Sequence, residues 1–163
     1  MGGQDRIVAA IAARQHGVVA RWQLLAAGIS SRWIEKRLDK GSLIKVFRGV
    51  YRVGHVAPSM EADYLAAVLA CGNGAVLSGR AAAQLCGLIR DTPHPESGVT
   101  TTTERRIEGI TTHRARVGDT RDATTWNGIP VTTPARTLVD LAAVVYAGEL
   151  ARAVHEALVF PCP

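Results

Sequence analysis

The sequence predicts an α+β fold, in which an N-terminal winged helix-turn-helix precedes a mixed domain of helices and a small antiparallel sheet. Three observations support this prediction: a cationic helix after a glycine-containing turn, a β-hairpin directly after that helix, and an uneven charge distribution. The 163-residue chain has a net charge of +5, but residues 1–56 hold ten Lys/Arg against three Asp/Glu, whereas residues 57–163 hold nine against eleven. We therefore place a nucleic-acid-binding domain at residues 1–56 and a second domain at residues 57–163.

The central helix is expected over residues 31–40. Ser30 or Ser31 is a suitable N-cap, and Gly41 ends the helix because glycine readily takes the left-handed conformation that follows a last turn. Ile34 and Leu38 share one face at helical spacing, while basic side chains occupy the opposite face. The DNA-contacting candidates of this helix are Ser31, Arg32, Trp33, Lys36 and Lys40.

The segments around this helix complete the pattern of a winged helix-turn-helix. Residues 22–27 predict a short helix with Trp22 in the core, and Gly28 opens a turn of the usual length. Residues 43–47 and 50–53 predict a hairpin, with Gly49 supplying a positive φ angle. Residues 18–19 either add a strand to this wing or pack beneath it. The candidate phosphate contacts of the wing are Lys45, Arg48 and Arg52.

The remaining elements follow from hydrophobic periodicity and turn residues. Asn127-Gly128 is a strong hairpin signal, and Pro130 predicts an edge strand or a bulge because proline lacks an amide donor. Thr133-Pro134 predicts a helix start, after which Arg136 and Asp140 are spaced to pair. Further helices are expected over residues 5–15, 60–71, 79–88 and 148–159, and strands over 75–78, 99–103, 111–116, 124–126 and 129–132.

No catalytic or metal-binding motif emerges, so we predict neither an enzyme nor a cofactor. The five histidines lack metal-site spacing, and acidic residues near the expected strand ends (104, 108, 119 and 122) are better explained as solvated loop charges than as a nuclease site. Three widely spaced cysteines, Cys71, Cys86 and Cys162, without a Cys-x-x-Cys argue against a disulfide framework. Cys71 and Cys86 are expected to be small buried hydrophobes in a reducing cytoplasm. No apolar run is long enough to span a membrane. Ser78 is expected to cap a helix, and an anion site there is the weaker alternative.

Residues 5–55 resemble the N-terminal winged-helix domain of the AbiEi-type antitoxins of type IV toxin–antitoxin systems. The resemblance rests mainly on residues 25–30, 34–38 and the run Leu-Ile-Lys-Val-Phe-Arg-Gly-Val-Tyr at 43–51. Residues 75–83 and 128–142 are similar to the second segment of actinobacterial members. Many such members continue into a domain like the very-short-patch repair endonucleases, which this form is expected to lack.

The resemblance implies a repressor that binds inverted repeats of double-stranded DNA in its own promoter. It also implies a nucleotidyltransferase-like toxin that is opposed without a stable complex. Two alternatives stay open: a DNA-targeting module of a truncated nuclease fusion, and a protein-interaction domain whose winged helix is only a scaffold. A cationic helix face is most often a solvated surface, so the prediction depends on helix, hairpin and charge asymmetry together. The sequence leaves open whether the protein is a monomer or a dimer.

Overall fold

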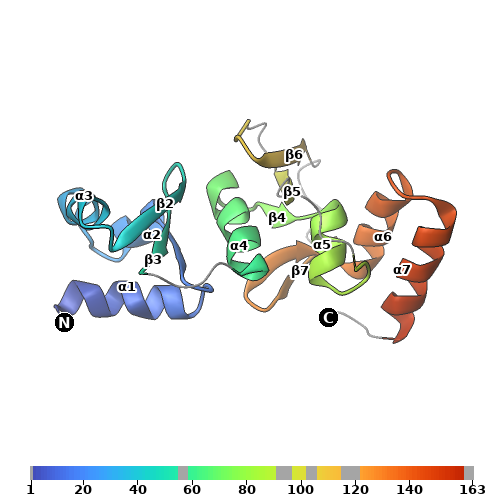
Figure 1. Cartoon of the computed structure of the whole chain (residues 1–163), viewed down its shortest axis with the longest axis horizontal. Coiled ribbons are helices and arrows are strands. Elements are labelled where there is room, and N and C mark those ends of the chain that lie inside the picture. The colour runs from blue at the N-terminus through green and yellow to red at the C-terminus, as the bar shows by residue number, and fades with distance from the viewer. Residues whose placement is uncertain (1, 55–58, 91–96, 102–105, 115–121, 160–163) are drawn as a thin grey trace. The chain divides into compact units, whose positions relative to one another are not determined.

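The computed structural model describes residues 2–54, 59–90, 97–101, 106–114 and 122–159. The chain divides into two compact units, Met1–Ala70 and Cys71–Pro163. Each unit is described by itself, and both combine helices with a small sheet (Figure 1). The α+β class predicted from the sequence is therefore confirmed.

The first unit has the element order of a winged helix, with one more helix at its end (Figure 1). A helix and a short strand precede the helix-turn-helix, and a hairpin follows it. The elements are α1 (Gly3–Ala13), β1 (Val18–Ala20), α2 (Arg21–Ala26), α3 (Ser31–Asp39), β2 (Leu43–Phe47), β3 (Val50–Val53) and α4 (Met60–Cys71).

The sheet of this unit is antiparallel, with the strand order β1-β3-β2. Residues 18–19 therefore do add a strand to the wing, since Val19 pairs with Tyr51 of β3. The β2–β3 hairpin turns at Arg48-Gly49, where Gly49 has a φ of 77° as expected for a two-residue turn. The register shifts between Lys45 and Phe47, which is a β-bulge next to the turn.

Two hydrophobic clusters hold the first unit together. One joins α1, α2 and α3 to the sheet and includes the fully buried Leu24, Ile29 and Ile34. The other joins the sheet to α4, through contacts of Val18 and Val50 with two alanines of the helix. This second cluster explains why the compact unit extends to residue 70. The expected domain boundary after residue 56 stays a prediction about domains, and residues 55–58 lie outside the described part of the chain.

The second unit packs three helices on a five-stranded sheet of order β6-β5-β4-β8-β7. Helix α5 contacts α6 and β5, and α6 also contacts α7. Fully buried Leu77, Val99, Val131 and Leu141 lie in these layers. The elements are β4 (Val76–Leu77), α5 (Gly79–Leu85), β5 (Ser97–Thr101), β6 (Ile110–Arg114), β7 (Ala123–Trp126), β8 (Ile129–Thr132), α6 (Pro134–Ala142) and α7 (Ala147–Val159).

The sheet of the second unit differs from the purely antiparallel one expected. β5 pairs with β6 in parallel and β4 pairs with β8 in parallel, so the sheet is mixed. The prediction that Pro130 marks an edge strand is also wrong, since β8 lies between β4 and β7. Proline is tolerated there because the two-residue β4 meets β8 only at Leu77 and Val131. The Asn127-Gly128 hairpin is confirmed, with positive φ at both residues.

Candidate nucleic-acid interface

Helix α3 presents a cationic outer face. The Ser30 hydroxyl caps its first turn by accepting a hydrogen bond from the Trp33 amide at 3.3 Å, and Gly41 follows its end with a φ of 69°. Ile34 is buried against the first cluster, which fixes the opposite face toward solvent. That face carries exposed side chains with no ionic partner among the described residues, namely Arg32, Lys36 and Lys40.

The wing adds two more basic side chains. Lys45 on β2 and Arg48 in the turn are both exposed, and neither makes an ion pair with any described residue. Five of the eight predicted DNA-binding residues are thus exposed cations that form no ion pair with any described residue. Such groups can exchange their counterions for phosphates without first breaking a contact within the protein.

Arg21 links the wing to the start of α3, a role that no sequence pattern indicates. Its backbone amide donates to the Gly49 carbonyl at 2.7 Å, and its Nη2 donates to the Ser31 hydroxyl at 2.9 Å. The first residue of α2 therefore contacts both the wing turn and the first residue of α3. Ser31, a predicted DNA-binding residue, is half-buried and already accepts this bond.

Arg52 differs from the other wing cations. Its side chain is 16% exposed and its Nη2 lies 2.9 Å from Oδ1 of Asp63 in α4, which is itself 56% exposed. Its Nε is buried without a hydrogen-bond partner. Because this guanidinium is already paired and mostly covered, the geometry assigns Arg52 to packing between β3 and α4 rather than to phosphate binding.

Trp33 lies on the flank of α3 and packs partly against the first cluster. The guanidinium carbon of Arg37 lies 4.8 Å from the centre of its ring, which is within the range of a cation–π contact. Arg37 also donates to Asp5 of α1 at 2.6 Å. Trp33 therefore belongs to a structural contact between α1 and α3, and its predicted contact with DNA stays a prediction.

The sequence-based placement of Trp22 in the core is wrong, since its side chain is 52% exposed. Leu24, two residues on, is fully buried and sets the inward face of α2. At 100° per residue this puts Trp22 on the outer side. Leu25, next to Leu24, is also exposed, at 44%.

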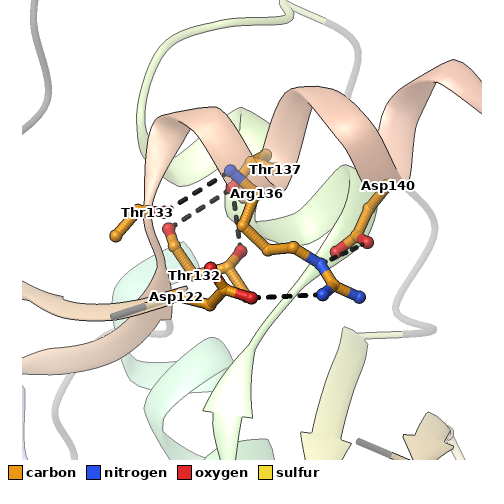
Figure 2. A network of polar contacts seen from close by, with 6 residues as sticks. All are labelled: Asp122, Thr132, Thr133, Arg136, Thr137 and Asp140. Carbon is orange, nitrogen blue, oxygen red and sulfur yellow. Dashed lines mark hydrogen bonds and ion pairs between the residues drawn. The ribbon is translucent and has the colours of Figure 1, made fainter. Parts of the chain in front are cut away.

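The second unit has its own polar network, drawn in Figure 2. Arg136 lies between two carboxylates, with Nε 2.9 Å from Asp140 and Nη1 3.3 Å from Asp122. The hydrogen bond and charge of Asp140 are the main cause that raises the pKa of Arg136 above its ordinary value. The buried hydroxyls of Thr132 and Thr137 share a hydrogen bond at 2.8 Å. This exposed network fastens the start of α6 to β8, and the expected pairing of Arg136 with Asp140 is confirmed.

Other sequence-based candidates have defined places in the fold. Cys71 and Cys86 are both buried, as predicted. Within the described residues no cluster of His, Cys, Asp and Glu has metal-binding geometry. Of the residues weighed for chemistry, His55, His94, Glu104, Asp119 and Cys162 lie outside the described part. None of the described helices has the length and apolar character needed to cross a bilayer.

The first unit is a winged helix-turn-helix, in which α2 and α3 form the helix-turn-helix and β2–β3 form the wing. Residues 6–54, which span this module almost completely, match the family of transcriptional regulators described as AbiEi antitoxins. The resemblance seen in the sequence is thus confirmed over this segment. A search of curated proteins found no match to the chain.

Proposed function

We propose that this protein binds double-stranded DNA through α3 and the wing and represses transcription from its own promoter. The observation that carries the proposal is the group of exposed cations on α3 and the wing that form no ion pair with any described residue. Both elements belong to the segment that matches a family of transcriptional regulators.

The interface divides into base-reading and phosphate-holding residues. Arg32 and Lys36 lie in the middle of the outer face of α3, where they would enter the major groove and read guanine edges. Lys40, Lys45 and Arg48 lie at the helix end and on the wing, where they would hold phosphates and set the register. Three such phosphate contacts per bound copy would give a salt slope of about −2.7.

Two exposed carboxylates, Glu35 and Asp39, lie on α3 among these cations. A carboxylate next to DNA repels phosphates but accepts a hydrogen bond from the amino group of cytosine. We infer that they limit non-specific binding and thereby favour a defined operator. Neutralising Glu35 by Glu35→Gln should raise the affinity for scrambled DNA more than the affinity for the operator.

The finer part of the proposal is that the protein is the antitoxin of a type IV toxin–antitoxin system. Its support is the family of residues 6–54 and the resemblance of the chain to such antitoxins. In this role it would bind inverted repeats as two copies, whose half-sites are about one helical turn apart. It would oppose a nucleotidyltransferase-like toxin without forming a stable complex with it.

Binding to the upstream DNA of the gene, compared with a scrambled duplex of equal length over a salt series, tests DNA recognition. A preference for the upstream DNA that persists near physiological salt supports the repressor. Equal and steeply salt-dependent binding to both duplexes would reduce the winged helix to a non-specific tether. Arg32→Ala should lower the preference for one base position, whereas Arg14→Ala, an exposed arginine at the end of α1, serves as the matched control.

The antitoxin role needs a separate test in cells. Co-expression with the product of the neighbouring gene should restore growth, while affinity purification of either protein should not recover the other. A stable complex of the two proteins, or a toxicity that this protein does not relieve, would contradict the type IV assignment and leave DNA binding unaffected.

A further inference from the structure

The second unit contains a groove that the repressor function does not use. Its volume is about 680 Å³, which is within the size range of small-ligand sites. One side of the groove is formed by strands β5 and β6, and the other by helix α6, with the start of α5 between them.

One face of the β5–β6 pair forms the polar floor. Gly98 pairs with Thr111 and Thr100 pairs with His113, so these four residues alternate onto the same face of the two parallel strands. Gly98 has no side chain to fill the space beside Ser78, because an added Cβ would lie 2.8 Å from the Ser78 carbonyl oxygen. The floor therefore leaves open space at Gly98, next to Ser78, which we call the inner end of the groove. At the other end, Thr100 and His113 supply hydroxyl and imidazole groups.

Helix α6 forms the apolar wall. Val139, Ala143 and Val144 lie on one side of the helix end and line the groove. Val139 is 67% exposed and Val144 is 61% exposed, although both are aliphatic. Neighbouring exposed valines on a groove wall are unusual for surface positions and are typical of a surface that contacts an apolar part of a ligand.

The inner end of the groove contains an unsatisfied buried hydroxyl. Ser78 is 1% exposed, and its Oγ makes no hydrogen bond to any described residue. The expected side-chain cap is absent, since the Ser78 side chain does not bond to the first turn of α5. A buried hydroxyl without a partner is costly, so a hydroxyl beside an open groove indicates a partner supplied from outside.

One arginine of the groove can bind an anion. Among the described residues, the charged groups that line the groove are Arg80, Arg114, Arg136 and Asp140. Arg80 is paired with Glu149 at 3.2 Å, and Arg136 is held by its two aspartates (Figure 2). Arg114, at the end of β6, is exposed and has no partner among the described residues. It is thus the arginine that is ready to bind an incoming anion.

From these observations we propose that the groove binds a small organic phosphate of about the size of a mononucleotide. Arg114 would bind the phosphate, together with His113 and the hydroxyls of Ser78 and Thr100. A phosphate group has more acceptor oxygens than a carboxylate and so matches this larger set of donors. The apolar wall of α6 would contact the ring of the ligand.

Calorimetric titration of the full chain with adenosine monophosphate, inorganic phosphate and adenosine tests this proposal. Adenosine monophosphate should bind at least about tenfold more tightly than either fragment, because only it reaches both the donors and the apolar wall. Arg114→Gln should weaken its binding about tenfold. Arg152→Gln, which changes an exposed arginine of α7 outside this groove, should leave the affinity unchanged.

Two further variants separate binding from folding. Ser78→Ala removes a hydroxyl that has no partner in the protein, so it should weaken binding without lowering the melting temperature. Val139→Asp places a carboxylate on an exposed site of the wall and should abolish binding. Equal binding of inorganic phosphate and adenosine monophosphate, or binding insensitive to Arg114→Gln, overturns the proposal. So does binding of a single-stranded oligonucleotide without terminal phosphate in preference to the mononucleotide. None of these results bears on operator binding by the first unit.

Discussion

Two arginines of the wing, Arg48 and Arg52, are four residues apart and should respond in opposite ways to the same substitution. Arg48 is exposed and unpaired, whereas Arg52 is 16% exposed and bonded to Asp63 at 2.9 Å. Replacing each by glutamine removes one positive charge and keeps most of the side-chain length. The pair therefore compares a residue assigned to DNA with one assigned to packing.

For Arg48→Gln, the loss of one phosphate contact should reduce the salt slope of DNA binding by about 0.9. The melting temperature should be unchanged, because no contact within the protein is lost. For Arg52→Gln, the ion pair with the exposed Asp63 contributes only up to about 1 kcal/mol. The destabilisation is increased by the lost packing of the buried methylene groups of Arg52. It is partly offset because the variant removes the buried Nε, which has no hydrogen-bond partner among the described residues. A destabilisation of about 1 kcal/mol should lower the melting temperature by about 4–8 °C.

The measurements are fluorescence anisotropy with labelled operator over a salt series, and thermal unfolding followed by circular dichroism. Asp63→Asn is the companion variant of Arg52→Gln and should also lower the melting temperature without changing the salt slope. The reasoning is refuted if Arg52→Gln reduces the salt slope as much as Arg48→Gln while its melting temperature stays that of the unchanged protein.

Three other predictions concern the first unit. Burial raises the pKa of Tyr64 to about 12, so the folded protein keeps this phenol neutral while the unfolded chain ionises near pH 10. The contribution of neutral Tyr64 to stability is fully present below pH 10. The free energy of unfolding should fall by up to about 1.4 kcal/mol per pH unit from pH 10 to 12. Urea titrations over this pH range should show a smaller fall for Tyr64→Phe. Arg21→Gln removes the bond to Ser31 and should lower the preference for operator over scrambled DNA more than it lowers total affinity, whereas an equal loss on both duplexes would argue against a positioning role. A double-mutant cycle of Asp5→Asn with Arg37→Gln should give a coupling of about 1 kcal/mol in thermal unfolding, and additive effects would show that the 2.6 Å contact contributes nothing.

The elements that the sequence predicted well are those fixed by local chemistry. Helix α3 begins after its serine cap and ends just before Gly41, as predicted. Each of the two hairpins contains a turn residue with a positive φ angle. These signals act over a few residues, so tertiary contacts do not override them. Because these signals are local, the sequence predicts the order of helix, turn, helix and hairpin correctly.

The features that the sequence did not predict are of two kinds. Some depend on contacts between residues distant along the chain, and others lie in elements too short to show a periodic pattern. Helix α2 has six residues, which is too short a stretch for periodicity to fix its inward face, and Trp22 was placed wrongly. The inward face of α2 is fixed by Leu24 and by Gln23. The Gln23 side chain accepts a hydrogen bond from the Ala20 amide and bonds to Gln15 in the turn after α1. The partner of Arg52 lies on α4, beyond the wing itself.

The parallel pairing of β5 with β6 illustrates the same limit. Only eight residues separate the two strands, and so short a connection usually joins antiparallel neighbours. The threonine-rich pattern indicates strands but carries no information on their direction. The groove beside these strands could not be predicted, because it depends on this pairing and on the position of α6.

The contacts of Arg21 have a consequence for how the proposed interface would recognise DNA. Because the amide of Arg21 holds the wing turn and its guanidinium holds the first residue of α3, the two elements proposed to contact DNA are joined through one residue of α2. A helix in the major groove and a wing on the adjacent backbone must be spaced correctly to bind together. Reading by Arg32 and phosphate binding by Arg48 should therefore be coupled through Arg21. In the Arg21→Gln background, the effects of Arg32→Ala and Arg48→Gln on operator affinity should become more nearly additive, whereas unchanged coupling would mean that the two elements bind independently of this residue.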